Sequence, residues 1–294
     1  MESATANQVY TFLRHPGFAT ERETVFLAVS PRLDDQDRAR VRFLRFWDLG
    51  ILEGRVGEAL GLLDGPVVSN LVRDCGPLLL WNQGSTMPAM ILEQTLTLAV
   101  ADDAQLNRPE WVNCAAWYAA SDRRWDDHAV LLSHARDMIE RRSAAGDSTN
   151  ARVWEWVAGE QEAHRLWGLG RPADALREFE GLLASHAQTA WVLWSVGQLA
   201  LELDQPTKAE RAYRRLATGT GISDGPLAYL YLGRLYERTG RPAEARNAYG
   251  SFASAWRRAD PELQPLVDEA RLALARLLEA ESQAPVEFES PPET

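Results

Sequence analysis

Histidine and cysteine are the side chains of this 294-residue chain that would first be considered as metal ligands. No two of its five histidines stand four residues apart, the spacing that places two imidazoles on one face of a helix. Cys75 and Cys114 are the only cysteines, and neither lies near a histidine in the sequence. The pattern predicts no metal site, and it favours two buried, reduced thiols over a disulfide framework.

Motifs for nucleotide and acyl chemistry are absent from the sequence or are better explained by turns. Gly168-x-Gly170-x-x-Ala173 has the spacing of a dinucleotide fingerprint, but it follows a helical pattern and lacks the strand-to-helix turn that the motif needs. No Gly-x-Ser-x-Gly elbow and no phosphate loop occurs. Paired carboxylates such as Asp126-Asp127 stand at expected turns or helix starts, where the helix dipole favours acids. We therefore predict no catalytic residue, no cofactor and no enzymatic activity.

The composition is that of a folded, acidic protein. Hydrophobic residues make up 46% and charged residues 25% of the chain, and the formal net charge is −11. An acidic surface repels phosphate backbones, which argues against nucleic acid as a partner. No stretch reaches the ~18 uncharged apolar residues that span a bilayer, and the N-terminal residues lack a signal-peptide pattern. These observations predict a cytoplasmic protein that does not contact membranes. Lys208 is its only lysine, beside 30 arginines.

A short pattern recurs where one helical stretch ends and the next begins. A small or polar residue is followed by Arg or Gln, then, after one or two further residues, by an acid or Lys, and then by alanine. The pattern occurs at Gly54–Ala59, Gly170–Ala175, Asp204–Ala209 and Gly240–Ala245, with a weaker copy at Arg123–Ala129. The last three clear copies place their alanines 34 and 36 residues apart. Glycine suits the left-handed end of a helix and proline suits the start of one, so each copy predicts a joint between two antiparallel helices.

Apolar residues recur at helical spacing on both sides of the last two joints. Gly197 and Gly233 stand among them, and we expect the two helices of each pair to cross at these small residues. With these features, residues 191–216 and 227–256 resemble tetratricopeptide repeats. Residues 152–184 fit at the joint and the second helix, but Glu162 stands where the family has an apolar residue. The first helix of that unit is therefore expected to be longer or shifted.

The resemblance implies an all-α fold, a right-handed superhelical solenoid of about five or six helix-turn-helix repeats with a C-terminal capping helix. One degenerate repeat is expected near residues 70–105, and residues 143–150 are the clearest internal loop and a candidate hinge. The expected organisation comprises an N-terminal helical cap or linker (1–35), degenerate helical repeats (36–142), well-formed repeats (151–259), a capping helix with an apolar stripe of Leu266, Ala270, Leu274 and Leu277 (260–281), and a disordered acidic tail (282–294).

In this family the first helix of each repeat lines a concave groove that holds a partner. Aromatic and arginine side chains are enriched at binding hot spots, although the tryptophans also suit a helical core. We expect two arginines of the groove to meet a partner's carboxylate. Carried onto matching positions, the groove comprises Trp191, Trp194, Gln198, Glu202, Leu230, Arg234, Glu237 and Arg238, with His164 and Trp167 as equivalents one unit earlier.

The function that we favour from the sequence is an adaptor or regulatory subunit that binds a peptide or partner protein in this groove. The C-terminal part also resembles repeat regions of bacterial kinases and transcription regulators, so a ligand-sensing module of a signalling system is an alternative. A third is a self-assembling scaffold, in which the tryptophan patch packs against a second copy and the chain forms a homo-oligomer. Fold alone does not decide among these three.

Overall fold

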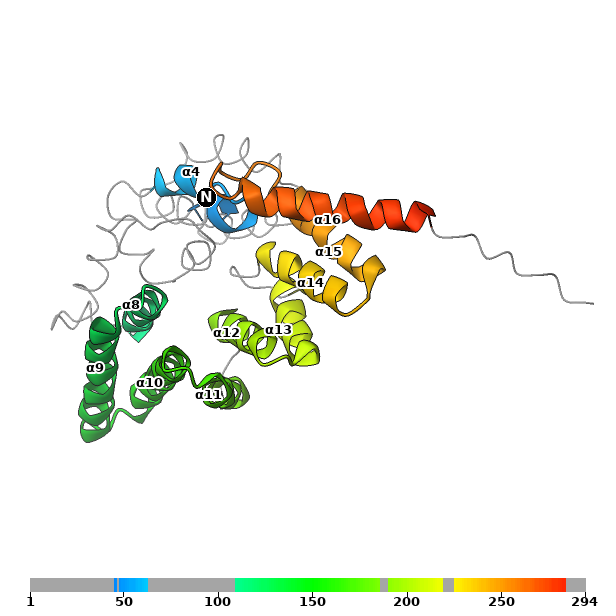
Figure 1. Ribbon diagram of the computed structural model, residues 1–294. Helices are drawn as coiled ribbons and strands as arrows, with labels where there is room; N and C mark the ends of the chain where they lie inside the picture. The colour runs from blue at the N-terminus through cyan, green and yellow to red at the C-terminus, as the bar shows by residue number, and fades with distance from the viewer. Residues whose placement is uncertain (1–44, 47, 63–108, 186–189, 219–224, 284–294) are drawn as a thin grey trace, which may run out of the picture. The chain divides into compact units, whose positions relative to one another are not determined.

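The computed structural model gives helices throughout the ranges that it describes (Figure 1). This result confirms the predicted all-α class. The predicted cap at 1–35, the degenerate repeat near 70–105 and most of the acidic tail lie outside the described residues. The described residues are 45–46, 48–62, 109–185, 190–218 and 225–283.

The chain divides into two compact units, Met1–Gly168 and Leu169–Thr294, here called unit 1 and unit 2. The division falls inside the stretch 151–259, which the sequence led us to treat as one set of repeats.

Three long helices form the described core of unit 1. They are α8 (Pro109–Ser121), α9 (Trp125–Ala144) and α10 (Ser148–Gly168), and each packs against the other two. Their apolar faces meet in a closed cluster around Leu131, Met138 and Trp154. Nearer the N-terminus, the π-helix η3 (Asp48–Leu52) packs against α4 (Val56–Leu60).

The loop that we considered as a hinge is a tight turn between α9 and α10. Only residues 145–147 separate the two helices, and Gly146 turns the chain with a φ of 73°. The Asp147 carboxylate accepts a hydrogen bond from the Asn150 side chain at 2.7 Å. Because the two helices pack against each other, this turn lies inside unit 1, and the boundary between the units comes after Gly168.

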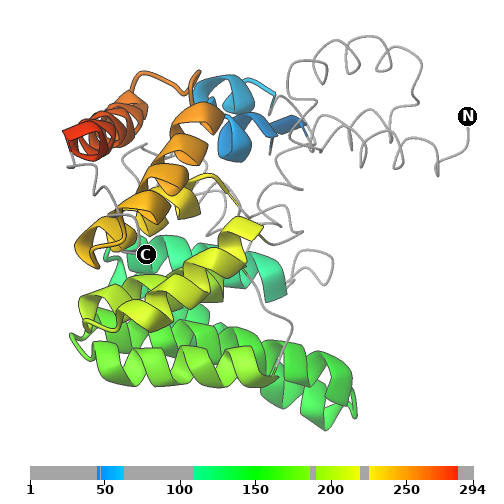
Figure 2. The same ribbon diagram turned by 90° about the vertical axis from the view of Figure 1, so that its right-hand side faces the viewer.

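The described residues of unit 2 form a succession of six helices, each packed against the next (Figures 1 and 2). Two of its helix pairs, α12 with α13 and α14 with α15, coincide with the predicted repeats at 191–216 and 227–256. At 21 residues, α10 is longer than α12, which has 13, as Glu162 had led us to expect. The helices of unit 2 are α11 (Pro172–Ser185), α12 (Ala190–Glu202), α13 (Pro206–Thr218), α14 (Leu227–Arg238), α15 (Pro242–Ala255) and α16 (Gln264–Gln283).

The two predicted crossing points each pair a glycine with a tyrosine ring. A Cβ atom added to Gly197 would lie 2.7 Å from ring carbons of Tyr213, and one added to Gly233 would lie 2.7 Å from the ring of Tyr249. Carbon atoms do not approach each other so closely without one of them moving. The helices in each pair therefore cross at a position that only glycine fills, as predicted from the sequence.

Every predicted joint that the structure describes contains a residue with positive φ. These residues are Gly54, Arg123, Gly170, Asp204 and Gly240. The residue five positions after it is buried in each of these joints. This residue is alanine in four joints and His128 in the weak one. Ala129, which we had expected to anchor the weak joint, is exposed. The left-handed residue sets the register of the joint, so counting from the alanine gave the wrong anchor.

The capping helix, α16, begins later than its sequence suggests. The Asp260 carbonyl accepts hydrogen bonds from the N–H groups of Leu263 and Gln264, which makes a turn of residues 261–263. The side of α16 that is buried carries Val267, Ala270 and Ala273. Of the predicted stripe only Ala270 is fully buried, and the three leucines lie at the edge of the contact. The buried face of α16 is thus rotated relative to the prediction, and α16 packs against α15 (Figure 2).

Candidate partner-binding sites

Three residues predicted to line the groove lie in the interior. Trp194 and Leu230, which occupy equivalent positions in two repeats, are 3% and 0% exposed, and His164 is buried in unit 1. The Trp194 ring packs edge-on against Tyr213 and Tyr231, with ring centroids 5.7 and 5.0 Å apart. These side chains offer no surface to a partner, contrary to the prediction, because they fill space between helices.

The charged residues predicted on α14 bind side chains of the chain itself. Arg234 donates from Nε and Nη2 to the two carboxylate oxygens of Glu269 on α16, at 2.6 Å each. These hydrogen bonds raise the pKa of Arg234. Glu237 accepts hydrogen bonds from Arg276 of α16 and from the Tyr249 hydroxyl. The carboxylate that we expected a partner to supply to Arg234 is thus supplied by α16.

The remaining predicted residues keep some exposed surface. Trp191 and Gln198 are half-buried on α12, and Glu202, near the end of that helix, is exposed. Arg238 is about half exposed, and its Nη2 lies 3.8 Å from the Asp204 carboxylate. Trp167, in unit 1, is half-buried and stacks on His164 with ring centroids 6.4 Å apart. These residues remain a predicted contact surface.

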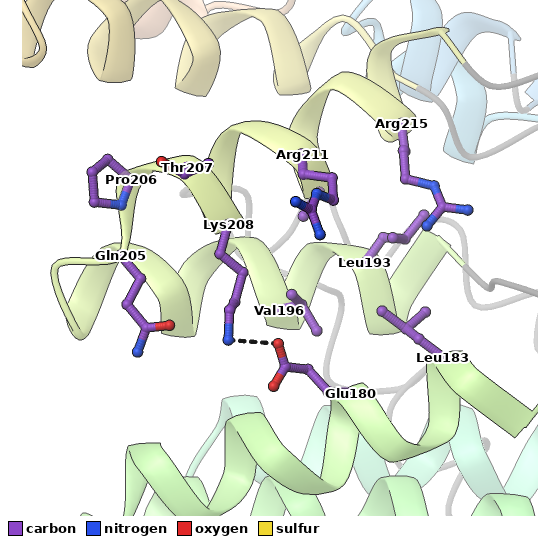
Figure 3. Close-up of a pocket in the computed structure, with 11 residues that line it drawn as sticks. Glu180, Leu183, Leu193, Val196, Gln205, Pro206, Thr207, Lys208, Arg211 and Arg215 are labelled. Atoms are coloured by element: carbon purple, nitrogen blue, oxygen red, sulfur yellow. Dashed lines mark ion pairs between the residues drawn. The ribbon is translucent and has the colours of Figure 1, made fainter.

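Unit 2 also contains a pocket that our reading of the sequence did not identify. It lies between α11, α12 and α13 and has a volume of about 510 Å³ (Figure 3). Five apolar residues line it, Leu183 from α11, Leu193 and Val196 from α12, and Pro206 and Ala212 from α13. The polar side chains that line it are Glu180 of α11 and, from the joint and from α13, Gln205, Thr207, Lys208, Arg211 and Arg215.

Positive charge dominates the polar side of this pocket. Lys208, Arg211 and Arg215 are spaced by three and four residues, which places them on one face of α13, and Figure 3 shows their side chains directed to the same side. Lys208 is paired with Glu180, with Nζ and Oε1 2.6 Å apart. Arg211 and Arg215 are exposed, and neither forms an ion pair with any residue that the structure describes. Two arginines therefore face an apolar floor, and within the described ranges neither has an ion-pair partner.

The pocket lies at the one described joint that departs from the common charge pattern. At the other four joints, the arginine after the left-handed residue pairs with an acid three residues later. These pairs are Arg55–Glu58, Arg124–Asp127, Arg171–Asp174 and Arg241–Glu244. At the fifth joint Gln205 replaces the arginine and Lys208 replaces the acid. The sequence therefore contained a signal for this site, a lysine where the repeat has an acid.

Unit 1 contains a buried polar cluster. Asn113 Nδ2 donates a hydrogen bond to Glu160 Oε2 at 3.0 Å, and Glu160 is 1% exposed. Burial raises the pKa of Glu160 to about 7 and lowers the pKa values of His128 and His164 to about 4 and about 3. Among the residues that the structure describes, no three His, Cys, Asp or Glu side chains are grouped as a metal site would require.

The comparisons with known proteins identify the repeats. The family model described as tetratricopeptide repeat matches residues 161–221 and 197–262. No curated protein and no solved structure matches the chain. Within the described ranges, no helix has the length and apolar character needed to cross a bilayer. The family match includes the two glycine–tyrosine crossings and the joint at which the pocket lies.

Proposed function

We propose, from the premise that this is a tetratricopeptide-repeat protein with its repeats over residues 161–262, that the chain is an adaptor or regulatory subunit. Repeats of this family generally bind other proteins or peptides. In this proposal unit 2 binds a segment of a partner protein, and the chain itself performs no catalysis. The proposal depends on a surface whose binding groups are not already engaged within the chain.

The single observation that supports this proposal best is the pocket between α11 and α13. It combines an apolar floor with Arg211 and Arg215, which have no carboxylate partner among the described residues. Arginine is one of the residue types enriched among the few residues that dominate binding energy at protein interfaces, and such residues cluster in pockets. The predicted groove is the weaker candidate, since Arg234 and Glu237 pair with α16. Its exposed members on α12 and α14 are proposed as a second contact surface.

Capture of a partner from native lysate tests this proposal. The full chain is compared with the double variant Arg211→Ala/Arg215→Ala and with a matched control, Arg257→Ala/Arg258→Ala. The control removes two exposed arginines of the same unit that do not line the pocket. We expect one stoichiometric protein to be captured by the full chain and by the control, and about tenfold less of it by the pocket variant. Equal capture by all three would contradict the assignment of the pocket.

A ligand-sensing role is the second candidate, because the pocket volume of about 510 Å³ also suits a small molecule. A ligand that binds only the folded chain raises its melting temperature by mass action. Thermal melts against pools of anionic metabolites would then show a rise for the full chain and the control, and none for the pocket variant. A rise that persists in the pocket variant would place the ligand elsewhere.

A further inference from the structure

We infer that the pocket recognises an extended segment of a partner protein with the pattern acidic–apolar–acidic. The inference rests on the proposed function and names the chemistry of the segment that is bound. Arg211 and Arg215 can each pair with a carboxylate, and the apolar floor can contact a hydrophobic side chain. A short peptide segment that carries two acids and one apolar residue would therefore match the pocket. The spacing of the arginines, the position of the floor and the state of Lys208 each support the pattern.

The spacing of the arginines matches an extended peptide. Arg211 and Arg215 are four residues apart on α13, which separates them by ~6 Å along the helix axis. Side chains two residues apart on an extended strand point to the same side and are separated by ~6.6 Å. Two acids at alternate positions of such a strand therefore lie opposite the two arginines. Adjacent acids point to opposite sides, and only one of them can meet α13.

The side chain between the two acids points away from α13. Figure 3 shows Leu193 and Val196 between the arginines of α13 and Leu183 of α11. A side chain directed from α13 toward α11 thus passes over Leu193 and Val196, which are buried, and reaches Leu183. An apolar side chain removes surface from water at this position, whereas a polar one would lose hydrogen bonds with water. The middle position of the segment is therefore apolar.

Lys208 limits the number of acids to two. Its ammonium is already paired with Glu180, so a third carboxylate at that end of the pocket would meet a protein carboxylate as well as the cation. The Glu180 carboxylate would repel this third carboxylate, which disfavours a segment with more than two acids. The Lys208–Glu180 pair therefore marks one end of the site, and Arg215 marks the other.

Fluorescence anisotropy with three labelled peptides tests the pattern. The probe is Gly-Ser-Glu-Leu-Glu-Ser-Gly. One control peptide carries Gln-Leu-Gln in place of Glu-Leu-Glu, and the other has adjacent acids, as Glu-Glu-Leu. We expect the full chain at low salt to bind the probe about tenfold more tightly than the Gln-Leu-Gln control and about threefold more tightly than the Glu-Glu-Leu control, since each arginine–carboxylate pair at an exposed site contributes a factor of about three. The Arg211→Ala/Arg215→Ala variant should lose that preference, and Arg257→Ala/Arg258→Ala should keep it. Equal binding of the three peptides, or an unchanged preference in the pocket variant, would overturn the inference.

The inference and the proposed function can fail separately. If the probe does not bind but lysate capture still requires Arg211 and Arg215, the function stands and the acidic–apolar–acidic pattern is wrong. If the probe binds but the pocket variant still captures the partner, the pattern stands and the proposed docking site is wrong. Two other occupants are also tested. Tighter probe binding by a chain that ends at Gln283 would assign the pocket to the chain's own Glu287–Glu289 segment, and a dimer that the probe dissociates would assign it to a second copy. Either result would overturn the assignment to a partner.

Discussion

Arg234 of α14 and Glu269 of α16 are joined by two hydrogen bonds of 2.6 Å each, although they lie 35 positions apart in the sequence. Arg276 of α16 reaches Glu237 of α14 with the charges reversed. The capping helix thus meets two of the charged side chains through which we had expected α14 to bind a partner. A partner that binds this face of α14 must therefore compete with the chain's own helix.

The first prediction concerns the energy of this pair. Because the two side chains are 36% and 42% exposed, solvent screens them, and we expect a coupling energy of about 0.5–1 kcal/mol between Arg234→Ala and Glu269→Ala. Denaturant unfolding of the two single variants and the double variant measures it, and amide exchange should show faster opening of α16 in each variant. Strictly additive effects would mean that the pair contributes nothing to the position of α16.

The second prediction contrasts two glycines in neighbouring helices. Gly233→Ala places a methyl group against the Tyr249 ring and should lower the free energy of unfolding by about 1–3 kcal/mol. Gly250→Ala fills open space inside α15 and should raise it by about 0.5–1 kcal/mol, because alanine favours a helix more than glycine does. Thermal melts of the two variants give the comparison. A gain in stability from both would show that α14 and α15 do not cross at Gly233.

The third prediction uses the left-handed residues of the joints. Arg123 has a φ of 57°, so Arg123→Gly should relieve backbone strain and stabilise the chain by about 1 kcal/mol. Gly240→Ala should cost about as much, since no atom lies near the added carbon and only its φ of 71° opposes alanine. Denaturant midpoints measure both changes. Shifts of the same sign would be inconsistent with a shared turn geometry.

The fourth prediction is a pH dependence that arises from Glu160. Burial raises its pKa from an ordinary 4.5 to about 7, so between these values the folded chain holds a proton that the unfolded chain releases. The contribution of Glu160 to stability is therefore complete below pH 4.5 and is lost as the pH rises toward 7. Glu160→Gln removes this loss and keeps an oxygen that accepts the Asn113 hydrogen bond.

Melting temperatures across pH 5 to 8 check this expectation. The melting temperature of Glu160→Gln should rise relative to that of the parent chain as the pH rises, and the difference between the two melting temperatures should level off above pH 7. His128 and His164 have lowered pKa values, so their contribution rises with pH up to about 6.5, the opposite sign. To first approximation they cancel in the difference between the two proteins. A difference that does not vary with pH would mean that Glu160 is charged in the folded chain throughout.

The sequence predicted the local geometry of the repeats well because that geometry depends on residues close together in the chain. Gly240 adopts the left-handed backbone conformation of the turn without strain. Ala245, five residues later, is small enough to be buried between the two helices. Gly233 leaves space for the ring of Tyr249, 16 positions on. His128 was missed because its role depends on the left-handed φ of Arg123, which an arginine side chain does not indicate.

The binding surface was predicted less well because its state depends on distant partners. The repeat pattern placed Arg234 on the expected face of α14, but no local signal showed that Glu269 would occupy it. Trp194 and Leu230 were assigned to the groove from equivalent positions in the family, and packing against neighbouring helices buries them. The pocket was missed because three helices form it, although Lys208 at an otherwise acidic position marked its location.

Lys208, at the rim of the pocket, is the only side chain in the chain that carries a primary amine. A reagent selective for amines therefore modifies this position and the α-amino group alone. A photoreactive group attached to Lys208 of the purified chain would form a covalent bond with whatever molecule enters the pocket when the chain is added to a cell lysate. Mass spectrometry of that adduct would then identify the occupant directly.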